Sequence, residues 1–459
     1  MKFKEMKIKS SDGLIFGKAP NPVKTRRGLL IGGGLVYPEL NFTVPESTLI
    51  NRDTLPELID MYSNLVKNVL ERAVELESNG LVLEFETLLE MTNDPFIGTE
   101  IVKAMNNICE EFYIKYGLKT EIRLTPNDSR DMERPPKMRN GKYLDAMFKL
   151  FEKGSDAGAD LLSIESTGGK EIHDDALMNC DIRLSLFSLA ILGVRDMKFL
   201  WNNIVKIAKR KGKIAASDTA CGFANTAMVL ADKNYIPKVF SAAVRMISVV
   251  RSLVAIEEGA QGPHKDCGYE GVYIKAISGI PISMEGKSAA CAHLSPVGNI
   301  SCAAADLWSN ESVQNIKLLA GMAPTVFEEI LEYDTRILNT ASACDEKSAR
   351  QLQKLLIESD CHRDPQAFVL SPEFVLEVAS EILKYDNHYM AALKSSLKGL
   401  QICKEAIKSG FLKSSEREKD WLERIIDELS SCPEDESKFI DEVLPLVDTE
   451  KCDLKQYEL

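Results

Sequence analysis

Apolar residues follow two different patterns along the first two-thirds of this chain. Some stretches are short and almost continuously apolar, which is typical of buried strands, and others have apolar residues every three to four positions, which is typical of amphipathic helices. The clearest helical pattern spans residues 55–78. Strand-like runs lie at residues 28–36, 81–86, 120–125, 160–165, 213–216, 252–257, 280–285 and 313–319, with helical patterns between most of them.

The alternation of these runs with helices predicts an α/β fold. Alternating strand–helix units favour a parallel sheet, and eight of them favour a closed (β/α)8 TIM barrel over an open sheet. Beyond residue 322 the strand signal ends and helical periodicity continues. We therefore expect a barrel over residues 1–322 and an added C-terminal helical region over residues 323–459. The helical patterns of that region span residues 326–338, 349–359, 373–385, 390–408 and 416–429.

Charge and cysteine usage narrow the class of protein. The net charge of -13 argues against a nucleic-acid binder, because such proteins neutralise phosphates with an excess of basic residues. Eleven cysteines, an odd number without a CxxC pair, indicate a reducing compartment rather than a disulfide framework. The first residues are charged and lack the apolar core of a signal peptide. No apolar run approaches the roughly 20 residues that span a bilayer. We expect a cytoplasmic protein that does not cross a membrane.

Three strand ends carry side chains that can bind a metal ion. Glu165 ends the fourth run, Cys221 follows the fifth, and Cys267 lies in the loop after the sixth. A lone cysteine is most simply a small buried apolar residue, but the carboxyl ends of barrel strands meet at one face. A carboxylate and two thiols there suit zinc with a fourth position open, and thiolates disfavour magnesium and calcium.

The segments around these residues carry a resemblance to a known family. Residues 162–171 (LSIESTGGKE), 218–222 (DTACG) and 262–270 (GPHKDCGYE) resemble the zinc-binding segments of the methanol:corrinoid methyltransferases of methylotrophic methanogens and some acetogens. The similarity extends to residues 281–287 and 306–314. This resemblance implies a TIM barrel with a helical addition, one zinc ion held by Glu165, Cys221 and Cys267, and a tight complex with a separate corrinoid protein. Cys291 and Cys302 stay open as alternatives to Cys267.

The implied reaction needs a Lewis acid and a source of protons. Hydroxide is a poor leaving group, so zinc bound to the methanol oxygen would help a cobalt(I) nucleophile to take the methyl group. Anionic ligands weaken the Lewis acidity of zinc, so a nearby proton donor would help. Asp218, His264 and Asp266 lie on the right loops, and the sequence does not choose among them.

The corrinoid is expected on the partner protein. Cobalamin-binding modules commonly place a histidine under the cobalt with an Asp-x-His-x-x-Gly segment, and none of the five histidines lies in such a segment. The expected partners are therefore methanol and a cognate corrinoid protein in a heteromeric complex, for which a core formed by a homodimer of this chain is one arrangement.

Three alternatives stay open at the level of the sequence. The same zinc and corrinoid chemistry could act on another small methyl donor. An unrelated metal-dependent barrel lyase or aldolase would work without cobalamin. A non-catalytic subunit would only dock on the corrinoid protein and shield it.

Overall fold

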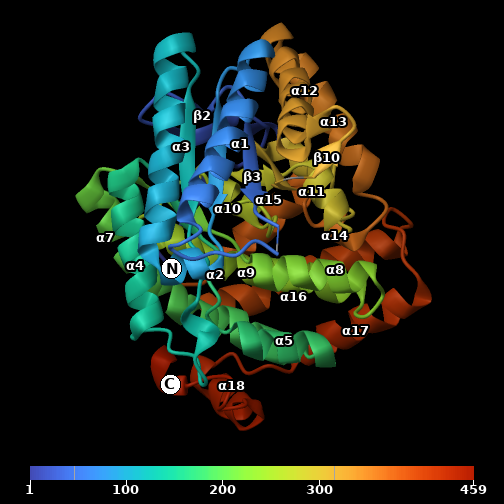
Figure 1. Cartoon of the computed structure of the whole chain (residues 1–459). Coiled ribbons are helices and arrows are strands. Elements are labelled where there is room, and N and C mark those ends of the chain that lie inside the picture. The colour runs from blue at the N-terminus through green and yellow to red at the C-terminus, as the bar shows by residue number, and fades with distance from the viewer. Residues whose placement is uncertain (46, 315) are drawn as a thin grey trace.

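A curled parallel sheet forms the centre of the molecule (Figure 1). The computed structural model describes residues 1–45, 47–314 and 316–459. Within these residues the sheet has seven strands in the order β7-β6-β5-β4-β3-β9-β8, and every pair of neighbours is parallel. The strands are β3 (Tyr37–Thr43), β4 (Leu81–Glu86), β5 (Thr120–Thr125), β6 (Leu161–Ile164), β7 (Ile214–Asp218), β8 (Ser283–Glu285) and β9 (Leu307–Val313).

A short extended segment, residues 261–264, joins the two edges of this sheet. The Gln261 N–H donates to the Ala215 carbonyl of β7 at 2.8 Å, and the Ser283 N–H of β8 donates to the His264 carbonyl at 2.9 Å. A parallel bridge also pairs His264 with Ile282. The segment therefore takes the place of the sixth barrel strand and completes the ring, which confirms the predicted TIM barrel.

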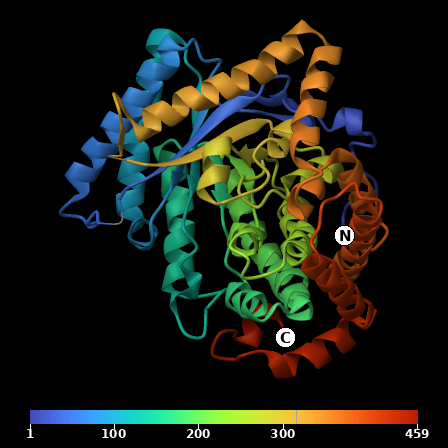
Figure 2. The same cartoon turned by 90° about the vertical axis from the view of Figure 1, so that its right-hand side faces the viewer.

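Helices form the outer layer of the barrel (Figure 2). Those that follow or precede the strands are amphipathic as predicted, and α1, for example, buries Leu58, Tyr62, Val66 and Val69. The longer helices of this layer are α1 (Leu55–Glu75), α3 (Pro95–Tyr116), α4 (Lys142–Ala157), α7 (Val194–Lys211) and α9 (Lys238–Glu258). Shorter helices and helical turns are α2 (Leu89–Asn93), α5 (Lys170–Asn179), α6 (Ile182–Phe187), α8 (Thr226–Asp232), α10 (Gly271–Ser278), α11 (Lys287–Ala292), η2 (Arg130–Met132), η3 (Ser188–Gly193), η4 (Cys221–Asn225) and η5 (Ile300–Ala304).

The predicted strand at residues 252–257 is wrong, because these residues form the end of α9. This helix is buried on almost all sides, so its apolar residues lack the one-sided spacing that identifies a helix in a sequence. By length and composition α9 is also apolar enough to cross a membrane, contrary to expectation, and 94% of its most apolar window is buried inside the protein. Its apolar character is therefore that of a core helix.

The first and last predicted strands are displaced from the barrel strands. Within residues 28–36 only β2 (Leu30–Gly33) is a strand, and it pairs antiparallel with β1 (Lys18–Lys24) outside the barrel. The first barrel strand is β3. The last is β9, which precedes most of the predicted run 313–319, and Asn315 of that run lies outside the described residues. Two short strands follow it, β10 (Lys317–Leu318) and β11 (Gly321–Met322).

The C-terminal third is helical, as predicted. Its first helix, α12 (Ala323–Cys344), begins at the predicted boundary but packs on β3, β9 and α1, within the outer layer of the barrel. The later helix α16 packs along α9 (Figure 1). The boundary at residue 322 stays a prediction. The remaining helices of this region are α13 (Glu346–Asp360), α14 (Pro365–Phe368), α15 (Pro372–Ile382), α16 (His388–Lys408), α17 (Glu416–Ser430) and α18 (Glu436–Val443), with single turns η6 (Leu444–Leu446) and η7 (Leu454–Tyr457). One more single turn, η1 (Ser11–Gly13), lies near the N-terminus.

Candidate metal centre

Glu165, Cys221 and Cys267 meet at the carboxyl ends of neighbouring barrel strands. Glu165 directly follows β6, Cys221 begins the π-helical turn η4 after β7, and Cys267 follows residues 261–264. One ligand atom from each of the three lies within 4.8 Å of the others. The Cys267 sulfur is 3.2 Å from Glu165 Oε1, and the two cysteine sulfurs are in contact, with their Cα atoms 5.3 Å apart. The structure thus brings together the three predicted ligands.

The chemistry of these donors fits a zinc ion. Two sulfurs and a carboxylate oxygen are donors that zinc prefers, and three protein ligands leave room for a fourth. Cys267 is fully buried, whereas Glu165 and Cys221 are partly exposed, so the group is reached from the mouth of the barrel. The alternative ligands lie elsewhere: Cys291 is exposed on α11, and Cys302 is a buried thiol in η5 whose pKa is raised by burial. Neither belongs to the group around Glu165.

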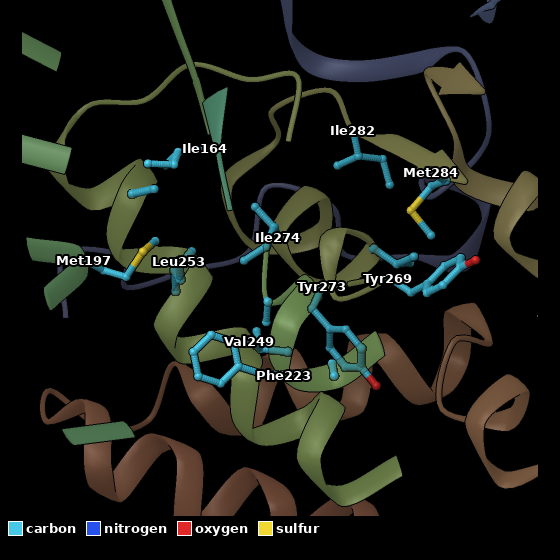
Figure 3. Close-up of a cluster of buried hydrophobic side chains, with 14 of the residues drawn as sticks. Ile164, Met197, Phe223, Val249, Leu253, Tyr269, Tyr273, Ile274, Ile282 and Met284 are labelled. Carbon is cyan, nitrogen blue, oxygen red and sulfur yellow. The ribbon is translucent and has the colours of Figure 1, made fainter. Parts of the chain in front are cut away.

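The turn that carries Cys221 is anchored in the core. Phe223, two residues further along η4, is buried in the hydrophobic cluster that also contains Val249 and Leu253 of α9 (Figure 3). The guanidinium of Arg251, on the same helix, lies 4.7 Å from the centre of the Phe223 ring. Packing of this aromatic side chain therefore fixes the position of the turn and of the thiol at its start.

A buried lysine holds the Glu165 carboxylate. Lys265 Nζ lies 3.0 Å from Glu165 Oε1, 3.1 Å from Glu84 Oε1 and 3.1 Å from Asp266 Oδ1. Burial raises the pKa of Glu165, the Lys265 ammonium opposes this effect, and the resulting pKa is about 8. Burial likewise raises the pKa of Glu84, to about 7. Lys265 thus offsets part of the negative charge beside the metal ligands; sequence reasoning missed it, although it lies two residues before Cys267.

A second buried carboxylate, Glu270, ties the two cysteine loops together. Its Oε1 accepts a hydrogen bond from the Ala220 N–H at 2.7 Å, directly before Cys221. It also accepts from the Thr219 hydroxyl at 3.2 Å, and the same hydroxyl oxygen accepts from the Gly268 N–H at 2.9 Å. A Cβ atom at Gly268 would collide with both Glu270 and Thr219, so this position requires glycine. Apart from its place in the loop, nothing in the sequence marks Glu270 as a functional residue.

Burial and hydrogen bonding act in opposite directions on Glu270. Burial raises the pKa of this carboxyl, but hydrogen bonds from His264, the Ser252 hydroxyl and the Ala220 N–H outweigh burial and lower the pKa to about 2. The carboxylate is therefore ionised over the whole physiological range. His264 lies beneath it, fully buried, with Nε2 3.5 Å from Glu270 Oε1 and Nδ1 3.2 Å from the Ser217 hydroxyl.

Asp218 has a supporting position at the end of β7. Its carboxylate accepts hydrogen bonds from the Trp201 indole N–H at 3.2 Å and from the Ser166 backbone N–H at 3.3 Å. The Arg251 guanidinium lies 3.7 Å away. Asp218 is fully buried, and its contact with Ser166 fixes the backbone directly after Glu165.

Asp266, the third predicted proton donor, is buried beside Lys265. Burial raises the pKa of this carboxyl, but the Lys265 ammonium, the Ser309 hydroxyl and the Arg123 guanidinium together outweigh burial, so the pKa falls below its usual value. Asp266 therefore carries no proton at neutral pH. Asp218 and His264 are buried against other groups of the protein. None of the three candidates is therefore identified as the proton donor.

Comparisons with known sequences and structures each match almost the whole chain. Residues 1–458 match the sequence model of the family described as methanol-cobalamin methyltransferase B subunit. A methanol–corrinoid protein co-methyltransferase from Methanosarcina barkeri is 37% identical over 448 residues, covering 96% of this chain and 95% of that protein. The crystal structure of the methanol:cobalamin methyltransferase complex from Methanosarcina barkeri contains a chain that is 35% identical, with a TM-score of 0.94 over 100% of this chain and 99% of that one.

Proposed function

We propose, because the chain belongs to the family of methanol-cobalamin methyltransferase B subunits, that it transfers the methyl group of methanol to the corrinoid cobalt of a partner protein with the help of one zinc ion. The observation that carries this proposal is the meeting of Glu165, Cys221 and Cys267 at the mouth of the barrel. Membership of this family argues against an unrelated lyase or aldolase. Thiol ligands need a reducing environment, which supports a cytoplasmic location.

Zinc would be held by Glu165, Cys221 and Cys267. When bound, it supplies Lewis acidity toward the methanol oxygen and so eases the breaking of the carbon–oxygen bond. The residues around it prepare the site: Lys265 orients Glu165 and offsets negative charge, and Glu270 fixes the two cysteine loops relative to each other. Such supporting groups typically change metal affinity by 10- to 100-fold.

The corrinoid comes from the partner protein. The three ligands lie at the carboxyl ends of the strands, which is the face that TIM-barrel enzymes use for catalysis, so the cobalt has to approach over this mouth. The absence of an Asp-x-His-x-x-Gly segment from the sequence supports a corrinoid carried by another chain. We propose that the two proteins form a heteromeric complex, with a homodimer of this chain as its possible centre.

The test combines metal content with methanol-dependent methylation of reduced cobalamin. Wild type is expected to hold about one zinc per chain, and Glu165→Gln, Cys221→Ser and Cys267→Ser are expected to lose both zinc and methyl transfer. The exposed Cys291 supplies a matched control, because Cys291→Ser should keep both. Zinc retained in Cys267→Ser but lost in Cys291→Ser would contradict the ligand set.

Two further measurements separate the remaining alternatives. Wild type is expected to methylate reduced cobalamin faster with methanol than with other small methylated compounds, and the reverse order would name another methyl donor. Cys221→Ser is expected to bind the corrinoid protein but to transfer no methyl group. This result would show that the chain has a catalytic role in addition to docking. Full methyl transfer by that variant would favour the non-catalytic role.

A further inference from the structure

A second polar cluster lies at the mouth of the barrel, outside the three zinc ligands. Glu285 ends β8, Glu311 lies in β9, and His293 follows α11. The imidazole lies between the two carboxylates, with Nδ1 3.1 Å from Glu285 Oε2 and Nε2 3.6 Å from Glu311 Oε2. Glu285 is fully buried, whereas the His293 side chain is 25% exposed. The cluster therefore holds an imidazole in a fixed place while leaving it in contact with solvent.

One side chain connects this cluster to the candidate metal centre. Asn225 is the last residue of η4, the turn that begins with Cys221. Its Nδ2 lies 3.3 Å from His293 Nδ1 and 3.9 Å from the Cys221 sulfur. A single amide group therefore separates the His293 imidazole from the sulfur of Cys221, one of the three candidate zinc ligands.

The charges around His293 favour its protonated form. The hydrogen bond to Glu285 raises the pKa of the imidazole, burial opposes it, and the charges of Glu285, Glu311 and Asp266 add to the rise, giving a pKa of about 9. Across the cluster, the Tyr269 hydroxyl donates to Glu285 Oε2 at 2.8 Å, and burial raises the pKa of Tyr269 well above its usual value, so this hydroxyl is neutral. These neighbours are three carboxyl groups and a neutral hydroxyl, which favour the imidazolium at neutral pH.

His293 has what the three donors predicted from the sequence lack. Asp218 and His264 are fully buried with their polar atoms directed at other buried groups, and Asp266 is ionised beside Lys265. His293 carries a proton and has access to solvent, from which the proton can be replaced.

We propose that His293 donates the proton to the oxygen that leaves methanol, with Glu285 and Glu311 holding the imidazole in position. This inference rests on the proposed function. In the reaction the electron pair of cobalt(I) forms the bond to the methyl carbon, and the carbon–oxygen bond breaks with its electrons staying on oxygen. The proton from His293 converts this oxygen to water, and the neutral imidazole regains a proton from solvent.

The first test is the pH profile of methyl transfer from methanol to reduced cobalamin by the zinc-loaded protein. Wild type should keep its rate below the pKa of His293 and lose it as the pH rises through about 9. His293→Gln should lower kcat roughly 100-fold, as is typical of a lost general acid, with little change in KM for methanol and no such alkaline limb. Added imidazole should restore part of the rate.

A surface histidine supplies the matched control. His362 pairs with Glu358 at 2.6 Å on the exposed end of α13, so it resembles His293 in chemistry but not in place. His362→Gln should leave the rate and its pH profile unchanged. If His293→Gln also leaves both unchanged while wild type is active, the proposal is wrong and the proposed function stands. If wild type transfers no methyl group from methanol, the proposed function fails first.

The second test does not depend on activity. Nuclear magnetic resonance of the zinc-loaded protein with ¹⁵N-labelled histidine, assigned with His293→Gln, should show His293 titrating near pH 9. Glu285→Gln should move this titration to lower pH, while zinc content stays the same. Titration of His293 near 6.5, the ordinary value for histidine, would overturn the proposal, because the imidazole would then carry too little proton at neutral pH.

Discussion

Glu270→Gln tests whether one buried carboxylate holds the two cysteine loops in place. In the wild type Glu270 accepts hydrogen bonds from Ala220 and Thr219, and through Thr219 it reaches Gly268. Glutamine keeps the size of the side chain and one acceptor oxygen, but it removes the negative charge that strengthens these bonds. The variant is therefore expected to fold with weaker support for the metal ligands.

The size of the effect follows from the pKa of Glu270. Its fall from 4.5 to about 2 corresponds to roughly 3 kcal/mol in favour of the ionised form in the folded protein, at about 1.4 kcal/mol per pH unit. Because the pKa is lower in the folded state, this stabilisation is present above pH 4.5 and is lost as the pH falls toward 2. The difference between wild type and variant should follow the same course.

Urea unfolding of both proteins between pH 3 and pH 8 measures this difference. We expect a gap of about 3 kcal/mol in the free energy of unfolding at pH 7 that narrows steadily below pH 4.5. Ser252→Ala, which removes one donor to Glu270, should cost only about 1–2 kcal/mol. Zinc affinity, measured against a competing chelator, should fall 10- to 100-fold in Glu270→Gln. An equal gap at pH 3 and pH 7 would show that the charge of Glu270 is not the source of the difference in stability.

Three further substitutions test the surroundings of the site. Lys265→Met leaves the buried carboxylates of Glu84 and Asp266, and the partly exposed one of Glu165, without their ammonium partner. It should cost about 3–5 kcal/mol in urea unfolding, and a loss below about 1 kcal/mol would contradict the ion cluster. Asp218→Asn removes the charged acceptor of the Trp201 indole N–H and should cost about 1–2 kcal/mol in urea unfolding. Tryptophan fluorescence should change as well, and an unchanged spectrum would contradict the hydrogen bond between Trp201 and Asp218. Leu253→Ala opens a cavity in the core at α9 and should cost about 2–5 kcal/mol, whereas the exposed Leu319→Ala should leave the unfolding midpoint unchanged.

Much of the barrel could be predicted because its strands are buried on both faces. The runs at 81–86, 120–125 and 160–165 are short, contain Leu, Val, Ile or Phe at their centres and lie between helical patterns, and each coincides with or contains a barrel strand. The same reasoning failed at α9, since a helix buried on all sides is as continuously apolar as a buried strand. It also missed the sixth strand position, residues 261–264, where only a few extended residues around Pro263 link the two edges of the sheet.

The place of Glu165 and Cys221 at the barrel mouth could be predicted from the sequence, because each directly follows a strand or its turn and the carboxyl ends of parallel strands meet at one face. The residues that surround them could be found only in the folded protein. Lys265 and Glu270 contact partners that are distant along the chain, such as Glu84 for Lys265 and Ser252 for Glu270. His293 lies between carboxylates from two different strands. Such contacts depend on the closure of the barrel and on the direction in which each loop turns, and these follow from packing of the whole core rather than from any local pattern.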